Sequence, residues 1–142
     1  MVSRLIALLL AAAVSLDAAA GPAFEGKDIK GSAYGNPDYA FRDHDGQART
    51  LRDFQGKVTL LFFGFLNCPN FCPLTLLKLK HVMSLLGEDA RRVQVAYVTL
   101  DPERDTPASM KSYVHAFHPG FTGLYTTPER TPKMALAFRI YN

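Results

Sequence analysis

The chain of 142 residues contains no tryptophan, only two cysteines and a formal net charge of only +3. Its basic residues are scattered, with short spots such as Arg91-Arg92 that are typical of solvated helix ends, so we expect no nucleic-acid partner. Two cysteines alone do not favour a structural zinc site, which takes four ligands. A Cys-x-x-Cys-His run is absent, which excludes covalent haem attachment. The length and the 48% of apolar residues indicate one ordinary globular domain.

The N-terminus lacks an apolar run long enough to span a bilayer, which takes about twenty residues. Arg4 precedes an apolar run of about twelve residues, 5–16, and Asp17 and the small residues 18–20 follow it. A basic start, a short apolar segment and an Ala-x-Ala site predict a signal peptide at residues 1–20. We therefore expect an exported protein of the bacterial periplasm. An uncleaved N-terminal membrane anchor is the alternative.

Residues 21–37 are rich in glycine and proline, which indicates an N-terminal arm or linker ahead of a domain at residues 38–142. That domain opens with a predicted hairpin at residues 39–51, which carries Asp45-Gly46 in its turn. A short helical turn is expected to close this region. The nearly continuous apolar run at residues 58–65 is typical of a strand that is buried on both faces.

A helix is predicted at residues 73–86, with Gly87 as its stop. Its apolar stripe consists of Leu74, Leu77, Val82, Leu85 and Leu86. Further along the chain we expect a strand at residues 93–100, a helix from Thr106-Pro107 to about Phe117, a short strand near Leu124, and a last helix at residues 131–139. This alternation of strands and helices predicts an α/β layer structure with parallel strands.

Cys68 and Cys72 lie four residues apart, directly after the first apolar strand. At a helix start this spacing places both sulfurs on one face of the first turn, where the helix dipole lowers the pKa of a thiol. Two thiolates suit the soft ion Cu(I), and they also suit redox chemistry. A purely structural disulfide would close too short a loop to add much stability. Asp101 follows the second strong strand, so we expect it near Cys68 at the same edge of the sheet.

Two segments of the chain resemble the SCO/SenC family. They are residues 56–73, GKVTLLFFGFLNCPNFCP, and residues 101–107, DPERDTP. The two motifs together at this spacing are specific, and the resemblance covers about residues 31–141. It implies a thioredoxin-like, three-layer α/β fold with a central mixed sheet. It also implies a copper protein that helps to assemble the CuA centre of cytochrome c oxidase.

The resemblance assigns the roles of copper ligands to Cys68 and Cys72, which it also allows to form a disulfide. It implies copper as the cofactor, as Cu(I) and with Cu(II) as a further candidate. The implied partners are the CuA-bearing oxidase subunit and a periplasmic thiol reductant or copper donor. Asp101 and Asp105 become candidates for groups next to the metal ligands, although a tight loop and a helix cap explain both carboxylates equally well.

The sequence departs from the family pattern at two points. Asn70 stands where many relatives have aspartate, which removes a negative charge beside the thiolates. The family's third copper ligand is a histidine that lies well after the segment equivalent to residues 138–141, and this chain ends at Asn142. We therefore expect that histidine, and the final strands and helix of the fold, to be missing from this chain.

None of the four histidines present is expected to replace that ligand. His44 lies in the predicted hairpin turn, His81 in mid-helix, and His115 and His118 at the end of the helix away from Thr106. Two functions stay open. One is a metallochaperone that delivers Cu(I), and the other is an enzyme, a thiol–disulfide oxidoreductase that acts on the cysteines of the oxidase subunit. The spacing of the cysteines favours the first, because oxidoreductases of this fold usually carry Cys-x-x-Cys.

Overall fold

The computed structural model describes Asn36 and residues 38–140. The predicted signal peptide and nearly all of the predicted arm at residues 21–37 lie outside the described residues. The described strands form one mixed sheet in the order β2-β1-β5-β4-β3. These strands are β1 (Phe41–Asp43), β2 (Ala48–Arg49), β3 (Val58–Gly64), β4 (Val93–Thr99) and β5 (Thr122–Tyr125). β3, β4 and β5 are parallel, whereas β1 is antiparallel to both of its neighbours.

Helical segments connect the strands, and local sequence signals set their ends. They are η1 (Leu51–Phe54), α2 (Phe71–Leu86), η2 (Gly87–Arg92), α3 (Pro107–Phe117) and α4 (Thr131–Ala137). The Thr106 hydroxyl caps α3 by accepting a hydrogen bond from the Ser109 backbone N–H at 3.2 Å. Gly87, with φ of +52°, ends α2 in a conformation that favours glycine. Among the described helices, none has the length and the apolar character needed to cross a membrane.

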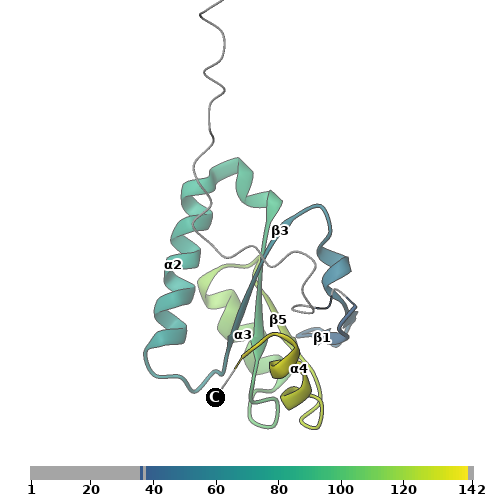
Figure 1. Cartoon of the computed structure of the whole chain (residues 1–142). Helices are drawn as coiled ribbons and strands as arrows, with labels where there is room; N and C mark the ends of the chain where they lie inside the picture. Colours follow the sequence, from purple (N-terminus) through teal and green to yellow (C-terminus); the bar gives the residue numbers. More distant parts are fainter. Residues whose placement is uncertain (1–35, 37, 141–142) are drawn as a thin grey trace, which may run out of the picture. The chain divides into compact units, whose positions relative to one another are not determined.

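β4 runs through the interior of the sheet, and its alternate side chains enter two different hydrophobic clusters. Val95 and Tyr97 pack with Leu76 of α2 and Val114 of α3 on one face. The intervening side chains pack on the other face with Leu124 of β5 and Met134 of α4; they are Ala96 and Val98. The sheet is therefore covered by α2 and α3 on one side and by α4 on the other (Figure 1). The predicted three-layer α/β fold with a central mixed sheet is confirmed.

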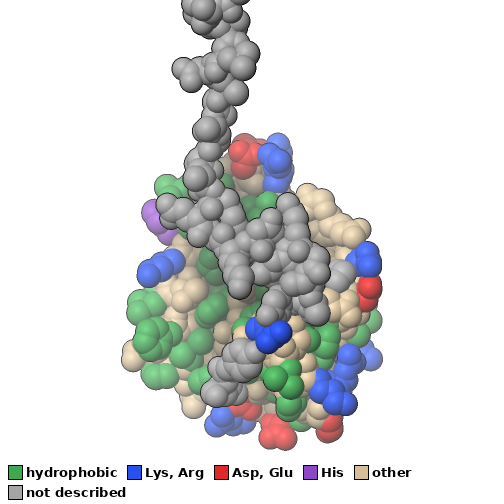
Figure 2. All heavy atoms as spheres, in the orientation of Figure 1, with side chains coloured by type: hydrophobic (Ala, Val, Ile, Leu, Met, Phe, Trp, Pro, Cys, Tyr) green, Lys and Arg blue, Asp and Glu red, His purple; other side chains and the backbone are tan. Residues whose placement is uncertain are grey.

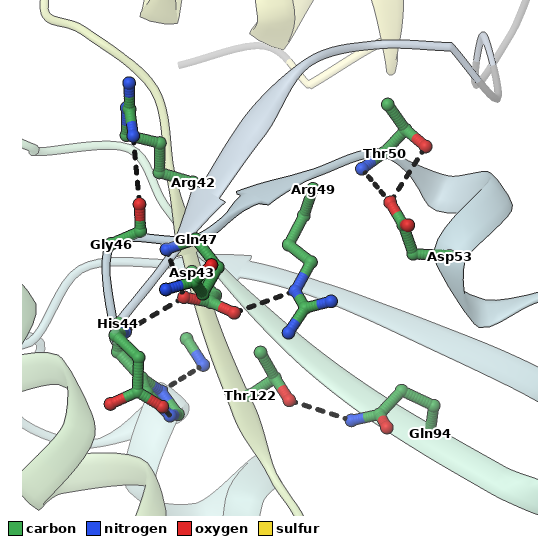
Figure 3. A network of polar contacts seen from close by, with 12 residues as sticks. Arg42, Asp43, His44, Gly46, Gln47, Arg49, Thr50, Asp53, Gln94 and Thr122 are labelled. Atoms are coloured by element: carbon green, nitrogen blue, oxygen red, sulfur yellow. Dashed lines mark hydrogen bonds and ion pairs between the residues drawn. The ribbon is translucent and has the colours of Figure 1, made fainter.

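The hairpin β1–β2 is fixed by a buried carboxylate, as Figure 3 shows. Asp43 accepts hydrogen bonds from the backbone N–H groups of Asp45 at 3.0 Å and Gln47 at 2.9 Å, and from Arg49 Nε at 2.8 Å. These bonds close the predicted turn and hold the two strands in register. The hairpin predicted from the Asp-Gly signal is confirmed.

β3 lies at the edge of the described sheet, and the prediction of a strand buried on both faces is wrong for its first half. Val58 is 63% exposed and Leu60 is 36% exposed. An apolar run reports the chemistry of the side chains and not the number of strands that pair with them, so it cannot separate an edge strand from a central one.

The apolar stripe predicted for α2 does not face the core. Leu74, Leu77 and Leu85 are 56%, 50% and 73% exposed. The side chains that pack against the sheet are instead Leu76 and Met83, which lie seven residues apart on one side of the helix. Figure 2 shows hydrophobic side chains at the surface on the left of the molecule, where Figure 1 shows α2. Because α2 is apolar on nearly every side, its pattern alone does not identify the packed face.

Candidate metal and redox site

The two cysteines lie where β3 passes into α2, at the carboxyl end of the parallel strands. Cys68 is in the loop before the helix and is partly exposed, whereas Cys72 is the second residue of α2 and is buried. The prediction that both residues lie in the first helical turn is therefore wrong for Cys68. The two residues are nevertheless in contact, because the Cys72 backbone N–H donates a hydrogen bond to Cys68 Sγ at 3.4 Å.

The surroundings of the two thiols shift their pKa values in opposite directions. The backbone N–H of Cys72, the Cys72 thiol, and the backbone N–H groups of Asn70 and Phe71 all donate to the Cys68 sulfur, and they lower the pKa of Cys68. Burial raises the pKa of Cys72, and the Cys68 side chain raises it further. Cys68 is therefore the thiol that ionises first, and Cys72 keeps its own proton to a higher pH.

Gly64 makes room for the Cys72 sulfur at the end of β3. A Cβ atom at this position would lie 2.8 Å from Cys72 Sγ and 3.1 Å from the Tyr97 hydroxyl oxygen. Both distances are too short for any side chain at position 64 to fit without displacing these atoms. The glycine thus allows α2 to start close against the sheet.

Asp105 connects the loop after β4 to the loop that carries Cys68. It is buried, and its Oδ2 accepts hydrogen bonds from the Leu66 backbone N–H at 3.1 Å and the Thr99 hydroxyl at 2.6 Å. Leu66 lies two residues before Cys68, so this carboxylate holds the cysteine loop in place. The Leu100 N–H also donates to the Gly64 carbonyl at 2.8 Å, so the segments after the two strongest strands are neighbours, whereas the closeness of Asp101 itself to Cys68 stays a prediction.

Asp101 has different contacts. Its carboxylate is paired with Arg104, and its backbone carbonyl accepts hydrogen bonds from the N–H groups of Arg104 and Asp105. These are the contacts of a tight loop. Asp105 therefore contacts the cysteine loop, whereas the Asp101 side chain pairs with Arg104 within its own turn.

Within the part of the chain that the structure describes, the metal-binding groups of this site are the sulfurs of Cys68 and Cys72. No group of three or more His, Cys, Asp or Glu side chains there is arranged to hold a metal ion. His44 packs edge to face on His115 with ring centroids 5.0 Å apart, and His118 Nδ1 accepts from the Gly120 N–H. His81 is exposed on α2. The cysteine pair therefore has the soft donor set that suits Cu(I), with two protein ligands.

Three residues of this site were not predicted from the sequence. They are Gly64, Thr99 and Tyr97. Gly64 had a detectable signal, since a glycine in an apolar strand marks a close approach of another group. Thr99 and Tyr97 had none, because their roles depend on which strand lies beside β3.

Fold and site together define a class of protein: a thioredoxin-like α/β protein with two neighbouring thiols at the start of its first long helix. Copper-bound ScoI of Bradyrhizobium japonicum has a similar structure, with a TM-score of 0.69 and 39% identity over 75% of this chain and 67% of its own. Copper-bound yeast Sco1 has a TM-score of 0.69 and 34% identity over 76% of this chain and 60% of its own.

The chain belongs to the SCO1/SenC family, whose model matches residues 27–142. The mitochondrial SCO2 homolog of Danio rerio is 41% identical over 117 residues, which are 81% of this chain and 42% of the relative. The mitochondrial SCO1 homolog 1 of Arabidopsis thaliana is 37% identical over 118 residues, which are 82% of this chain and 35% of the relative. The chain thus spans less than half the length of these curated relatives. The resemblance to this family seen in the sequence is confirmed.

Proposed function

We propose that this chain binds Cu(I) through Cys68 and Cys72 and delivers it to the CuA-bearing subunit of cytochrome c oxidase. The carrying observation is the pair of free thiols, which interact with each other where α2 starts. Thiolates are the ligands that Cu(I) prefers, and the backbone N–H groups around Cys68 stabilise the charged form that binds metal. The copper-bound structures of ScoI from Bradyrhizobium japonicum and of yeast Sco1 support the choice of metal.

A titration of the reduced protein with Cu(I), in competition with a chromophoric Cu(I) chelator, tests this proposal. We expect one Cu(I) per chain, and we expect Cys68→Ser and Cys72→Ser each to weaken binding by at least a hundredfold, because one sulfur cannot replace two. His81→Ala removes an exposed ligand-type side chain from α2 and serves as the control that keeps full affinity. Full stoichiometric binding by Cys72→Ser would disprove the proposal.

Thiol–disulfide exchange is a second candidate function, and the opposite pKa shifts of the two thiols favour it. The Cys68 thiolate would attack a substrate disulfide to form a mixed disulfide and release one substrate thiolate. Cys72 would then attack the Cys68 sulfur. The substrate leaves as a dithiol, and the protein is left with a Cys68–Cys72 disulfide that a thiol reductant of its compartment must reduce.

Alkylation and turnover distinguish this function from copper delivery. We expect iodoacetamide to label Cys68 before Cys72, with half of the maximal rate at a pH below about 8.5, the value of an ordinary thiol. The lowered pKa of Cys68 keeps its thiolate present at this lower pH. Turnover of a disulfide substrate by copper-free protein would support the enzymatic function, and equal labelling rates for the two cysteines would contradict it.

Export to the periplasm, with residues 1–20 as a signal peptide and residues 21–37 as an arm, is part of the same proposal. The support is the N-terminal sequence pattern of a basic start, a short apolar segment and an Ala-x-Ala site. Expression of the full chain in a Gram-negative bacterium, followed by N-terminal sequencing of the periplasmic fraction, tests it. A mature N-terminus near Gly21 is expected, and retention of the intact chain in the membrane fraction would favour the anchor instead.

A further inference from the structure

Tyr97 carries a polar group that the fold leaves without a partner. Its side chain is 0% exposed, on the face of β4 that packs against α2 and α3. Its hydroxyl has no hydrogen-bond partner, and in the described part of the chain it shares this property with Tyr113 alone. A buried donor without an acceptor costs stability, so such groups call for an explanation. Phenylalanine would fill the same space without this cost.

The Tyr97 hydroxyl and the sulfur of Cys72 both lie close to one point at the end of β3. Both atoms border the space above the Cα of Gly64, where a Cβ would lie 3.1 Å from the hydroxyl oxygen and 2.8 Å from Cys72 Sγ. The ring of Tyr97 is held edge-on between Phe62, with centroids 5.6 Å apart, and Tyr113, with centroids 5.8 Å apart. Aromatic packing on both sides therefore fixes the ring, and with it the place of the hydroxyl at the end of β3.

We propose that Tyr97 is a positioning residue for the metal-bound form of the site, in which its hydroxyl donates a hydrogen bond to Cys72 Sγ. This inference rests on the proposed function. A neutral thiol is a weak acceptor. A thiolate is a strong one. When Cu(I) binds, each thiol releases its proton to solvent and its sulfur lone pair bonds the metal, with no change in oxidation state. Cys72 then becomes the acceptor that Tyr97 lacks.

The free energy that the unpaired hydroxyl costs in the metal-free protein is thus regained on binding. Copper affinity and metal-free stability should therefore respond differently to the loss of this one oxygen atom. Truncation of a residue that only fills the core would lower the metal-free stability without weakening copper binding specifically.

The variant Tyr97→Phe tests the inference against Tyr39→Phe. Tyr39 lies with the cluster on the opposite face of the sheet, and its hydroxyl already donates to the Arg130 carbonyl at 3.2 Å. For each reduced protein, the midpoint of urea unfolding is measured without metal, and Cu(I) affinity is measured by competition. We expect Tyr97→Phe to bind Cu(I) about tenfold more weakly, with a metal-free midpoint equal to or above that of the wild type. Tyr39→Phe should lower the midpoint and leave the affinity unchanged.

Two results would overturn the role of Tyr97. One is a Cu(I) affinity of Tyr97→Phe within twofold of the wild type, and the other is a lower metal-free midpoint with unchanged affinity. Failure of the proposed function is distinguishable from both, because the wild-type protein would then bind no Cu(I) at all.

Discussion

At the scale of single residues, the cysteine site depends on the absence of a side chain at position 64. Cys72 Sγ occupies space that a Cβ of this residue would need. The start of α2 can therefore lie this close to the sheet only because residue 64 is a glycine.

We expect Gly64→Ala to displace Cys72 and to lower Cu(I) affinity about tenfold, together with a loss of about 1–3 kcal/mol of unfolding free energy from overpacking. Gly123→Ala is the matched control, since its Cβ would meet Met110 Cβ at 3.2 Å, against α3 and away from the cysteine loop. That variant should lose stability and keep its copper affinity. Urea unfolding and Cu(I) competition measure both effects, and an unchanged affinity of Gly64→Ala would contradict the close contact.

At the scale of the elements, α2 has apolar side chains on two faces, of which one packs against the sheet and the other is exposed. Leu76 is completely buried between α2 and the sheet, whereas its neighbour Leu77 is half exposed. Adjacent residues on a helix point about 100° apart, so one leucine belongs to the core and the next does not.

We expect Leu76→Ala to cost about 2–5 kcal/mol of unfolding free energy, because it removes buried methyl groups and leaves a cavity. Leu77→Ala should change it by less than about 1 kcal/mol. Chemical denaturation of the two variants measures the difference. Equal losses would mean that the outer face of α2 also packs against something.

His44 links the hairpin β1–β2 to β5 through a hydrogen bond that requires Nδ1 of its ring to be unprotonated. His44 Nδ1 accepts a hydrogen bond from the Gly123 backbone N–H at 3.0 Å, so a proton on this nitrogen would break the bond (Figure 3). Burial lowers the pKa of His44; nearby Asp45 and Asp43 oppose this shift, while His115 and Lys111 add to it. The charged form is thus disfavoured in the folded protein.

Because the folded protein binds this proton less readily than the unfolded chain, stability should fall as the pH drops below about 6.5, the ordinary pKa of histidine. In His44→Asn the amide oxygen can accept from Gly123 without titrating, so the decrease between pH 7.5 and pH 5.5 should be smaller than in the wild type. His81→Asn, at an exposed position, should keep the wild-type pH dependence. Urea midpoints at each pH measure this, and parallel profiles for wild type and His44→Asn would rule out the effect.

At the scale of the whole molecule, the sheet, its two hydrophobic clusters and the cysteine site all draw on residues within 38–140. We expect a chain that starts at Ser32 to keep the urea midpoint and the Cu(I) affinity of the full chain, because it retains all of residues 38–140, which supply these described parts. Loss of either property would show that the first 31 residues belong to the folded unit.

The sequence anticipated the elements and the site because their signals are local. The Asp45-Gly46 turn, the Thr106 cap and the stop at Gly87 depend on the conformations of a few neighbouring residues. The cysteine pair was recognised for the same reason, from its spacing and its place after a strand.

What the sequence by itself determined is the order of strands and helices, the two-thiol motif and the family, since each depends on residue types at fixed spacings. Only the tertiary structure decided that β3 is an edge strand in the described sheet, that Leu76 and not Leu77 faces the core, and that Asp105 holds the cysteine loop while Asp101 pairs with Arg104. It also placed the unpaired hydroxyl of Tyr97 and the sulfur of Cys72 close to the same point above Gly64. The physical reason is that burial and pairing depend on which segments meet across the sheet, and contacts between β3, β4 and α2 join residues that are tens of positions apart in the chain.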